Sequence, residues 1–317
     1  MEGMSPALVE LALVLMGLGM LLLGGNKLVD GAQGLGLRYG LNPVFVGLTI
    51  VSLGTSAPEL ATTLTAAFKG APAMALGNVI GSNLANIGLV LGVVGILRTV
   101  MACDDTVHWD YPIMMGVLVM MWPFASDGEL SQEDGIIMVV ALIAYLVFVI
   151  HRERRSHIGE EEPESIDVGM SGPAAIAWIV VGVGVLTLGS DWLVVGAAGL
   201  ARRVGISERV IGLTLLALGT SLPELVSSLI AAFRGETELL VGNLVGSNIF
   251  NLLAILGLTT LISPLPVESW EVTMQDLIAM IGVSALGLFL LMNDMKIKRL
   301  EGVALLSSYV AALAWLY

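Results

Sequence analysis

One stretch of this chain occurs twice almost unchanged: "GLTIVSLGTSAPELATTL" spans residues 47–64 and "GLTLLALGTSLPELVSSL" spans 212–229. Each copy places a proline and a glutamate inside an apolar run, where proline interrupts a helix and a carboxylate is costly in lipid. A second pair, "GNVIGSNLANIG" at 77–88 and "GNLVGSNIFNLL" at 242–253, keeps the same separation of 165 residues. Chance does not preserve one offset across separated segments, so the chain contains a duplicated unit.

The composition of the chain indicates a membrane protein. Only 13% of its residues are charged and 56% are hydrophobic, whereas a soluble domain has about 25% charged residues. Apolar runs near the roughly 20 residues that span a bilayer as a helix recur, without the period-2 alternation of an outer-membrane barrel. We therefore predict an all-α integral membrane protein with ten transmembrane helices. The predicted spans are centred on residues 6–24, 42–68, 73–97, 111–125, 134–151, 173–190, 209–233, 238–262, 272–292 and 301–316.

The predicted spans form two five-helix repeats, residues 1–150 and 173–317, joined by a charged linker at 151–172. Because five is an odd number, the second repeat enters the membrane from the opposite side, as in the inverted repeats of secondary transporters. The first span follows "MEGMSP", which has no basic segment, so we interpret it as a retained span. The loops predicted inside contain ten Lys and Arg residues against four outside. This bias predicts a multi-pass protein of the cell (inner) membrane with both termini outside.

Several other classes of protein are disfavoured by the sequence. The single Cys103 excludes an internal disulfide and a multi-cysteine metal site. The net charge of −13 argues against nucleic acid as a partner. The chain contains no Ser/Lys dyad, paired-Asp motif or His-rich metal site, so we expect neither enzymatic activity nor a cofactor.

The first repeated motif predicts a broken helix with oxygen atoms gathered at the break. Pro58 has no N–H group, so the helix is expected to break near Gly54 and to free carbonyls around Ser52. Glu59 lies four residues after Thr55 and therefore on the same helix face, and Ser56 adds a second hydroxyl. The second copy supplies the corresponding set: the carbonyl of Ala217, the break residues Gly219 and Pro223, the hydroxyls of Thr220 and Ser221, and the carboxylate of Glu224.

A cation is the partner that this pair of acids requires. An acid at mid-membrane costs about 2.5–3.5 kcal/mol on translocon scales, and the repeated motifs contain no Lys or Arg to neutralise Glu59 or Glu224. Carboxylates, hydroxyls, amides and carbonyls form the hard ligand set that suits Ca²⁺, with Na⁺ as a competitor. The alternative is a structural kink with a protonated glutamate, and its occurrence twice argues against it.

The second repeated motif predicts a partner helix. The glycine pairs Gly77/Gly81 and Gly242/Gly246 have the small-xxx-small spacing that permits close helix packing. The polar pairs Ser82/Asn86 and Ser247/Asn251 each form one stripe on an apolar helix. Such a stripe is either hydrogen-bonding glue between helices or part of the ion site, and we favour the ion site. Four further amides lie off the stripe and are expected to bond to freed backbone: Asn78, Asn83, Asn243 and Asn248.

The two copies of "GTS(A/L)PE" and "GNxxGSN" resemble the paired alpha-repeats of the cation/calcium exchanger superfamily, specifically prokaryotic sodium/calcium exchangers. The resemblance covers nearly the whole chain. It implies ten transmembrane helices in two inverted halves, with the first and sixth helices sliding against a core that holds the ions. By position it implies central acidic ligands at Glu59 and Glu224. It also implies supporting ligands at Thr55, Ser56, Ser82, Asn86, Thr220, Ser221 and Ser247, with carbonyls near Ser52 and Ala217.

The chain departs from the family pattern at Asn251, where many members have an Asp. We keep Asn251 among the expected ligands, but its neutral amide argues against potassium co-transport. The expected function is antiport of Na⁺ against Ca²⁺ by alternating access, with the ions competing for two mid-membrane glutamates. A Ca²⁺/H⁺ antiporter is the alternative, and a cation channel is a lower one. The sequence does not decide stoichiometry, affinity, direction, or whether the protein is a monomer or a homo-oligomer.

Overall fold

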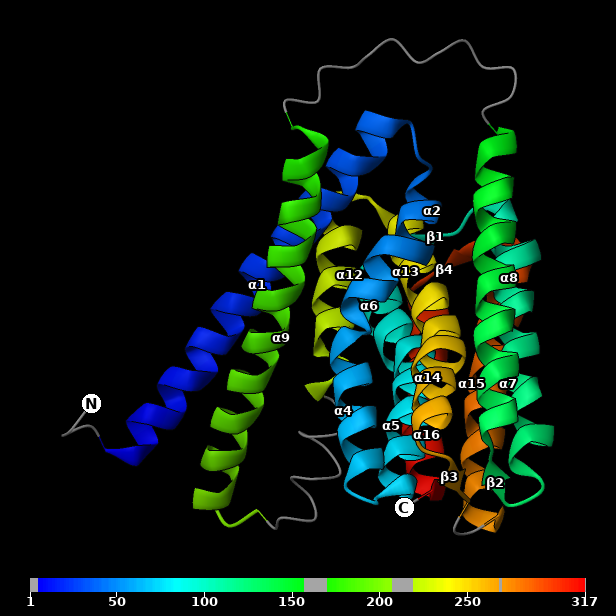
Figure 1. Ribbon diagram of the computed structural model, residues 1–317. Helices are drawn as coiled ribbons and strands as arrows, with labels where there is room; N and C mark the ends of the chain where they lie inside the picture. The colour runs from blue at the N-terminus through cyan, green and yellow to red at the C-terminus, as the bar shows by residue number, and fades with distance from the viewer. Residues whose placement is uncertain (1–4, 157–169, 207–218, 268–269, 317) are drawn as a thin grey trace.

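The computed structural model describes residues 5–156, 170–206, 219–267 and 270–316, which form a helical bundle with two short β-ribbons (Figure 1). Part of the predicted linker and of the 209–233 interval lies outside these residues. The first half contains α1 (Pro6–Tyr39), α2 (Pro43–Val46), the π-helix η1 (Gly47–Val51), α3 (Ser52–Thr55), α4 (Ala57–Phe68), α5 (Pro72–Leu84), η2 (Ala85–Leu91), α6 (Gly92–Leu97), η3 (Thr106–Asp110), α7 (Tyr111–Ala125) and α8 (Gln132–Ser156). The second half contains α9 (Gly172–Arg203), α12 (Leu222–Arg234), α13 (Thr237–Phe250), η5 (Asn251–Leu256), α14 (Gly257–Ile262), α15 (Trp270–Asp294) and α16 (Arg299–Leu316).

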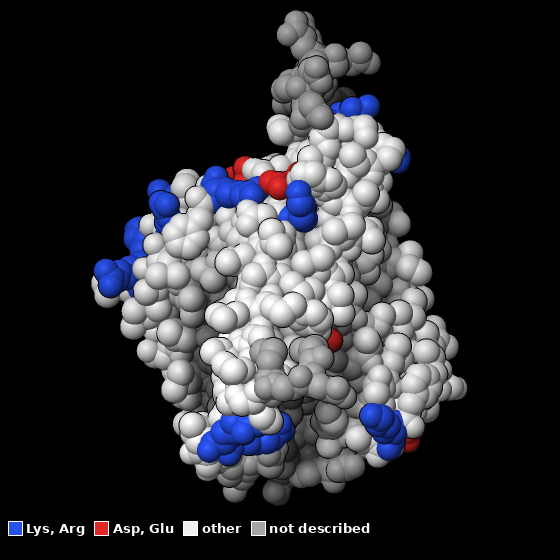
Figure 2. Space-filling model, turned by 90° about the vertical axis from the view of Figure 1, so that its left-hand side faces the viewer, with Lys and Arg blue, Asp and Glu red and all other residues white. Residues whose placement is uncertain are grey.

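The helices have the length and composition of a multi-pass membrane protein. Within the described part of the chain, seven are long and apolar enough to cross a membrane, and an eighth is added if the bent pair 43–55 and 57–68 forms one span. The other two predicted intervals contain α7, which has 15 residues, and α12. Figure 2 shows a broad uncharged band on the face that contains α1 and α9, with Lys and Arg gathered toward its two ends. Such a band is the surface that lipid tails require.

Helices α1 and α9 are longer than predicted, with 34 and 32 residues. The predicted spans 6–24 and 173–190 stopped where polar residues begin, but polar side chains do not end a helix. The two helices lie side by side and obliquely across one side of the bundle (Figure 1). Their contact is almost bare backbone: a Cβ on Gly24 would lie 2.7 Å from Leu186 N, and one on Gly189 would lie 2.9 Å from Leu21 N. Glycines recur every seven residues on both contact faces, at Gly17, Gly24 and Gly31 on α1 and at Gly182, Gly189 and Gly196 on α9.

The centre of the bundle is formed by two continuous helical rods, α5–η2–α6 and α13–η5–α14, which are largely buried. Helix α13 packs against the first part of the broken helix, α2–η1–α3. A Cβ on Gly242 would lie 2.6 Å from Val44 O, and one on Gly246 would lie 2.6 Å from Leu48 O. The expected close packing is therefore confirmed for this glycine pair. For Gly77 and Gly81, the segment that the repeat relates to this part of the broken helix, 208–216, lies outside the described residues, so their close packing stays a prediction.

Two short antiparallel ribbons join loops of the two halves. Strand β1 (Val100–Met101) pairs with β4 (Lys296–Ile297), and β2 (Glu129–Leu130) pairs with β3 (Leu265–Pro266). The ribbons lie at opposite ends of the bundle (Figure 1). β1 and β3 are again 165 residues apart, so the repeat extends into the loops. Two-residue strands leave no periodicity in the sequence, and these were not predicted.

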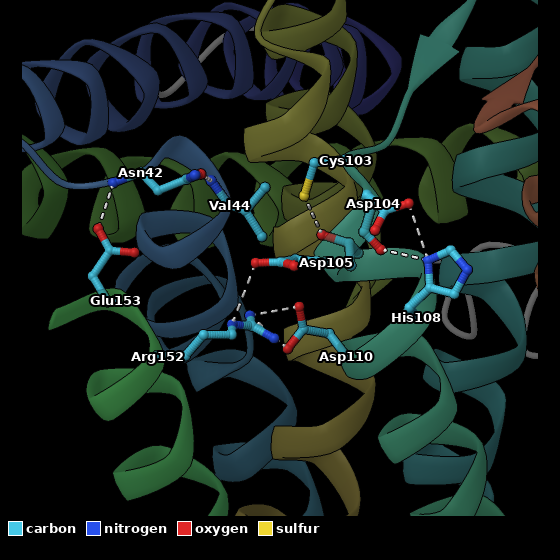
Figure 3. A network of polar contacts seen from close by, with 10 residues as sticks. Asn42, Val44, Cys103, Asp104, Asp105, His108, Asp110, Arg152 and Glu153 are labelled. Carbon is cyan, nitrogen blue, oxygen red and sulfur yellow. Dashed lines mark hydrogen bonds and ion pairs between the residues drawn. The ribbon is translucent and has the colours of Figure 1, made fainter. Parts of the chain in front are cut away.

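A polar network holds the start of the broken helix in place (Figure 3). Arg152, near the end of α8, donates from Nη2 to the two oxygens of the fully buried Asp110 at 2.9 and 2.8 Å. The next residue, Glu153, accepts a hydrogen bond of 2.7 Å from the backbone N–H of Asn42. The Asn42 side chain in turn caps α2 by accepting from Val44 N at 2.9 Å. The ends of α8, η3 and α2 are thereby tied together.

Candidate ion-binding site

The first repeated motif is a broken helix, as expected, but the break lies at Ser56 and not near Gly54. Helix α3 ends at Thr55, α4 starts at Ala57, and the two parts are bent by 42°. Pro58 occupies the first turn of α4, where its missing N–H costs nothing. The Ser52 carbonyl still accepts a hydrogen bond of 3.0 Å from Ser56 N. It is therefore not freed, in contrast to the expectation.

The second motif repeats this geometry. Pro223 lies in the first turn of α12, and Ser221 has backbone angles of −89° and 1°, close to the −82° and 2° of Ser56. Gly219 precedes the break, and its carbonyl accepts a hydrogen bond from the Ser190 hydroxyl on α9. Ser190 was not predicted from the sequence, because the position related to it by the repeat, Gly25, is a glycine. Ala217, the other expected carbonyl ligand, lies outside the described residues.

The two glutamates are brought together in the interior. Glu59 and Glu224 each have 1% of their surface exposed, and their carboxylates lie close enough to repel one another. Each is in the first turn of its helix, α4 or α12, where the helix dipole favours negative charge. Neither side chain faces lipid. The structure thus buries both acids in the interior, and their joint role as ion ligands stays a prediction.

Around the glutamates, oxygen atoms of both repeats are buried without a hydrogen-bond partner. Hydroxyls, amide oxygens and carboxylate oxygens are all among them. They are Ser56 Oγ, Glu59 Oε2, Asn86 Oδ1, Ser221 Oγ, both carboxylate oxygens of Glu224, and Asn251 Oδ1. Buried polar atoms are paired in the great majority of cases, so a concentration of unpaired acceptors needs an explanation. A bound cation is the partner that satisfies oxygen acceptors and no donors.

Four asparagines fix the orientation of two of these oxygens. Asn86 Nδ2 donates to Asn248 Oδ1 at 3.0 Å, and Asn251 Nδ2 donates to Asn83 Oδ1 at 2.9 Å. Asn83 and Asn248 also donate to each other's backbone carbonyls, at 3.2 and 3.4 Å. Because the NH₂ groups of Asn86 and Asn251 are occupied, their Oδ1 atoms remain as acceptors. The polar stripe therefore joins the two repeats by hydrogen bonds and also leaves the Oδ1 atoms of Asn86 and Asn251 free as acceptors.

Thr55 links the first broken helix to the opposite repeat. Its hydroxyl donates to Asn243 Oδ1 at 3.3 Å and lies 3.4 Å from Ser247 Oγ. Ser82 is buried as expected, whereas Thr220 is only half-buried. The expectation that Asn78 bonds to backbone is met by its contact of 3.3 Å with the Glu59 carbonyl.

Both partner helices change to π-helical winding at the site. Segments η2 and η5 begin at Ala85 and Asn251, so that Asn86 and Asn251 lie in their first turns. A π-turn is rare and is frequent at functional sites. It adds a residue to the turn and breaks the regular i, i+4 spacing by which Ser82 and Asn86 were grouped. The sequence contains no signal for the π-helical winding, except that the same residue types recur at the corresponding positions of the two repeats.

The unpaired atoms are carboxylate, amide and hydroxyl oxygens. Within the described residues no group of three or more His, Cys, Asp and Glu side chains could hold a metal. Carboxylate, amide and hydroxyl oxygens suit Ca²⁺ and Na⁺, while softer metals prefer imidazole or thiolate.

Comparison with known proteins agrees with this chemistry. The family described as "Sodium/calcium exchanger protein" matches residues 9–151 and 174–317. The sodium/calcium exchanger MaX1 of Methanosarcina acetivorans is 32% identical over 348 residues, with 98% of this chain and 99% of that protein covered. The inner membrane protein YrbG of Escherichia coli is 31% identical over 317 residues, with 98% and 97% covered.

A solved structure has the same fold. The sodium/calcium exchanger from Methanococcus jannaschii superposes with a TM-score of 0.83 at 28% identity, and 97% of this chain and 98% of that chain are covered. The family match extends over both halves of the chain and includes both copies of each motif. The chain therefore belongs to the sodium/calcium exchanger family, as a prokaryotic membrane antiporter that exchanges Ca²⁺ for another cation.

Proposed function

We propose that this protein exchanges Na⁺ for Ca²⁺ by alternating access, with both ions competing for Glu59 and Glu224. The observation that carries this proposal is the set of buried, unpaired oxygens contributed by both repeats, on elements that contact one another across the repeats, α4 with η5 and α12 with η2. Ser56, Ser221, Asn86 and Asn251 would complete the ligand shell around the two carboxylates. Thr55, Ser82 and Ser247 line the same region, and the carbonyls near Ser52 and Ala217, with Thr220, are the remaining candidate ligands.

The charges account for the coupling. Two carboxylates neutralise one Ca²⁺, whereas Na⁺ ions can distribute over the glutamates and the neutral oxygens. An empty site would leave two like charges buried together, and moving such a site past lipid is costly because burial disfavours uncompensated charge. Return of the empty carrier is therefore slow, and a bound ion is required on each crossing.

The same acids can bind protons, which makes Ca²⁺/H⁺ exchange the second candidate. We favour Na⁺ over H⁺ because neutral oxygens surround the carboxylates. Na⁺ can use these oxygens as ligands, whereas protons would need only the carboxylates. Protons should nevertheless compete, so exchange is expected to slow as the pH falls. The amide at Asn251 in place of a carboxylate leaves two acids in the cluster and favours independence from potassium.

The transport cycle proposed here uses ten helices in two inverted five-helix repeats. Both termini lie at the same end of the bundle (Figure 1), which an even number of spans requires. The β1–β4 and β2–β3 ribbons lie at opposite ends although their strands are related by the repeat, which supports inversion. The distribution of Lys and Arg favours both termini outside.

Flux measurements in vesicles test the proposal. The purified protein would be reconstituted and ⁴⁵Ca²⁺ uptake measured under an outward Na⁺ gradient, and separately under a pH gradient. Uptake that responds only to the pH gradient would establish the second candidate. Glu59→Gln and Glu224→Gln should each lower Na⁺-driven uptake at least 100-fold, because one carboxylate cannot neutralise Ca²⁺. Glu133→Gln, an exposed glutamate in the first turn of α8, is the matched control. Full activity in either site variant would remove the glutamates from the mechanism.

A further inference from the structure

A pocket of about 360 Å³ lies at the end of the bundle where α1 ends and where α2 and α13 begin, and we name it the α1–α13 pocket (Figure 1). It is lined by Gln33 and Glu236, which are joined by a hydrogen bond of 2.6 Å from Gln33 Nε2. Gln33 is neutral, and Arg234, two residues before Glu236, already pairs with Asp30. Within the described residues no Lys or Arg pairs with Glu236. The pocket therefore contains a carboxylate whose charge is not compensated by an ion pair.

One face of α13 leads from this pocket toward the candidate ion site. Leu239 lines the α1–α13 pocket and also a smaller cavity of about 10 Å³, which has room for about one water molecule. The smaller cavity is also lined by Asn243, whose Oδ1 accepts a hydrogen bond of 3.3 Å from Thr55. Glu236, Leu239, Asn243 and Ser247 follow one another at intervals of three or four residues and so share one helix face. Leu239, which is 3% exposed, separates the pocket from the smaller cavity.

The smaller cavity has a polar wall contributed by α12. Ser228, which is 1% exposed, lines it, and its Oγ is buried without a hydrogen-bond partner. The neighbouring Ser227 hydroxyl donates to the Glu224 carbonyl at 3.2 Å. In the first repeat the related residue, Thr63, accepts a hydrogen bond of 2.9 Å from Asn78. The second repeat thus leaves a hydroxyl oxygen unused beside a space of the size of a water molecule. An ion that loses its hydration water needs such oxygens.

We propose that Glu236 draws cations into the α1–α13 pocket and thereby raises the affinity of the exchanger for them at this end of the molecule. The inference deepens the proposed function and rests on it, since it assigns an approach to the site formed by the two glutamates. A charged side chain in a concave, largely apolar pocket raises the local concentration of ions of the opposite sign. The repeat relates Glu236 and Glu238 to Ala71 and Ala73. The attraction is therefore specific to one end of the molecule.

Exchange of ⁴⁵Ca²⁺ for unlabelled Ca²⁺ in membrane vesicles of known orientation tests the proposal. Glu236→Gln keeps an oxygen acceptor for Gln33 and removes only the charge. It should raise the KM for external Ca²⁺ about fourfold in inside-out vesicles, where salt screens but does not abolish the attraction. The maximal rate, and the KM in right-side-out vesicles, should stay unchanged. Inside-out vesicles are chosen because the pocket lies at the end opposite the two termini (Figure 1), which are predicted outside.

The charge of the ion provides a second readout. A carboxylate attracts Ca²⁺ with twice the energy with which it attracts Na⁺, so an about fourfold rise in the KM for Ca²⁺ should accompany an about twofold rise in the Na⁺ concentration that half-inhibits exchange. Glu238→Gln is the matched control, because it removes the same charge from the same turn of α13. Glu238 is not among the described lining residues of the pocket, and its substitution should change either value less than 1.5-fold, about the limit of measurement. Glu236→Asp retains the charge and should resemble the unaltered protein.

Three results would overturn the role of Glu236: an unchanged KM in Glu236→Gln, an equal rise in both kinds of vesicle, or a lower maximal rate at an unchanged KM. The unaltered protein gives a test that does not depend on folding of a variant. Raising the ionic strength with choline chloride should increase the KM for Ca²⁺ more in inside-out than in right-side-out vesicles, and equal increases would contradict the proposal. Because Ca²⁺–Ca²⁺ exchange does not involve the second ion, a KM effect without inhibition by Na⁺ would refute the Na⁺ assignment and not the role of Glu236.

Discussion

The two copies of "GNxxGSN" are nearly identical in sequence and are placed in different surroundings. Gly242 and Gly246 on α13 are buried against the backbone of α2 and η1, whereas Gly77 and Gly81 on α5 are exposed. Met74 and Leu239, which precede the two motifs at equivalent positions, differ in the same way. A duplicated sequence does not by itself produce two environments. The neighbours make the difference: α2 and η1 cover Gly242 and Gly246, whereas the segment related to them by the repeat, 208–216, lies outside the described residues.

Leucine substitutions of the two inner glycines should have the most unequal effects. A Cβ on Gly246 would lie 2.6 Å from Leu48 O and 2.7 Å from Ser52 Oγ, so a leucine must force the helices apart. At Gly81 an added Cβ meets nothing within 4 Å among the described residues. Overpacking of this kind costs about 1–3 kcal/mol and sometimes more. We expect Gly246→Leu to lower the thermal midpoint of the purified protein by several degrees or to prevent its folding, and Gly81→Leu to leave it within about one degree.

A second substitution tests the same difference. Gly77→Leu should resemble Gly81→Leu, because an added Cβ at Gly77 also meets nothing within 4 Å among the described residues. Similar melting temperatures for Gly81→Leu and Gly246→Leu would contradict the difference between the two glycine faces.

Aspartate substitutions of Asn86 and Asn251 test whether the two repeats contribute equally to the ion site. Asn86 and Asn251 each donate to an asparagine of the opposite repeat, at 3.0 and 2.9 Å. An aspartate cannot donate, and it adds a third negative charge beside Glu59 and Glu224. We expect Asn86→Asp and Asn251→Asp to reduce Na⁺-driven Ca²⁺ uptake by about tenfold each, through the loss of one hydrogen bond between neutral groups and the added repulsion between carboxylates. A large inequality between the two reductions would show that the two halves of the ion site are not equivalent.

Much of the centre could be predicted from the sequence, because the signals there are local. Proline in an apolar run indicates a broken helix, and two glutamates without a basic partner require another counter-charge. The position of the break at Ser56 was missed, because proline fits the first turn of the following helix. The continuation of α1 to Tyr39 was missed because polar residues on one face do not end a helix.

What the sequence could not show depends on contacts between the repeats. The reciprocal pairing of Asn83 with Asn248 joins residues 165 positions apart, and no local pattern specifies it. The π-helical start at Asn251 is likewise set by packing.

Substitution of Ser190 is expected to have the smallest effect. It tests the difference between the two helix breaks at a single hydroxyl group. Its hydroxyl donates to the Gly219 carbonyl at the second helix break, while its mirror position, Gly25, has no side chain and contacts Ile230 instead. Ser190→Ala leaves a buried carbonyl without this donor, which costs about 1 kcal/mol. We expect a loss of that size in stability, measured by thermal unfolding in detergent, and a change of less than threefold in exchange rate. Gly25→Ser is the reciprocal substitution: its Cβ would lie 2.5 Å from Ile230 Cδ1, so Ile230 must shift and a loss of stability is expected. If instead both substitutions leave the thermal midpoint unchanged, neither contact contributes to the stability of its helix break.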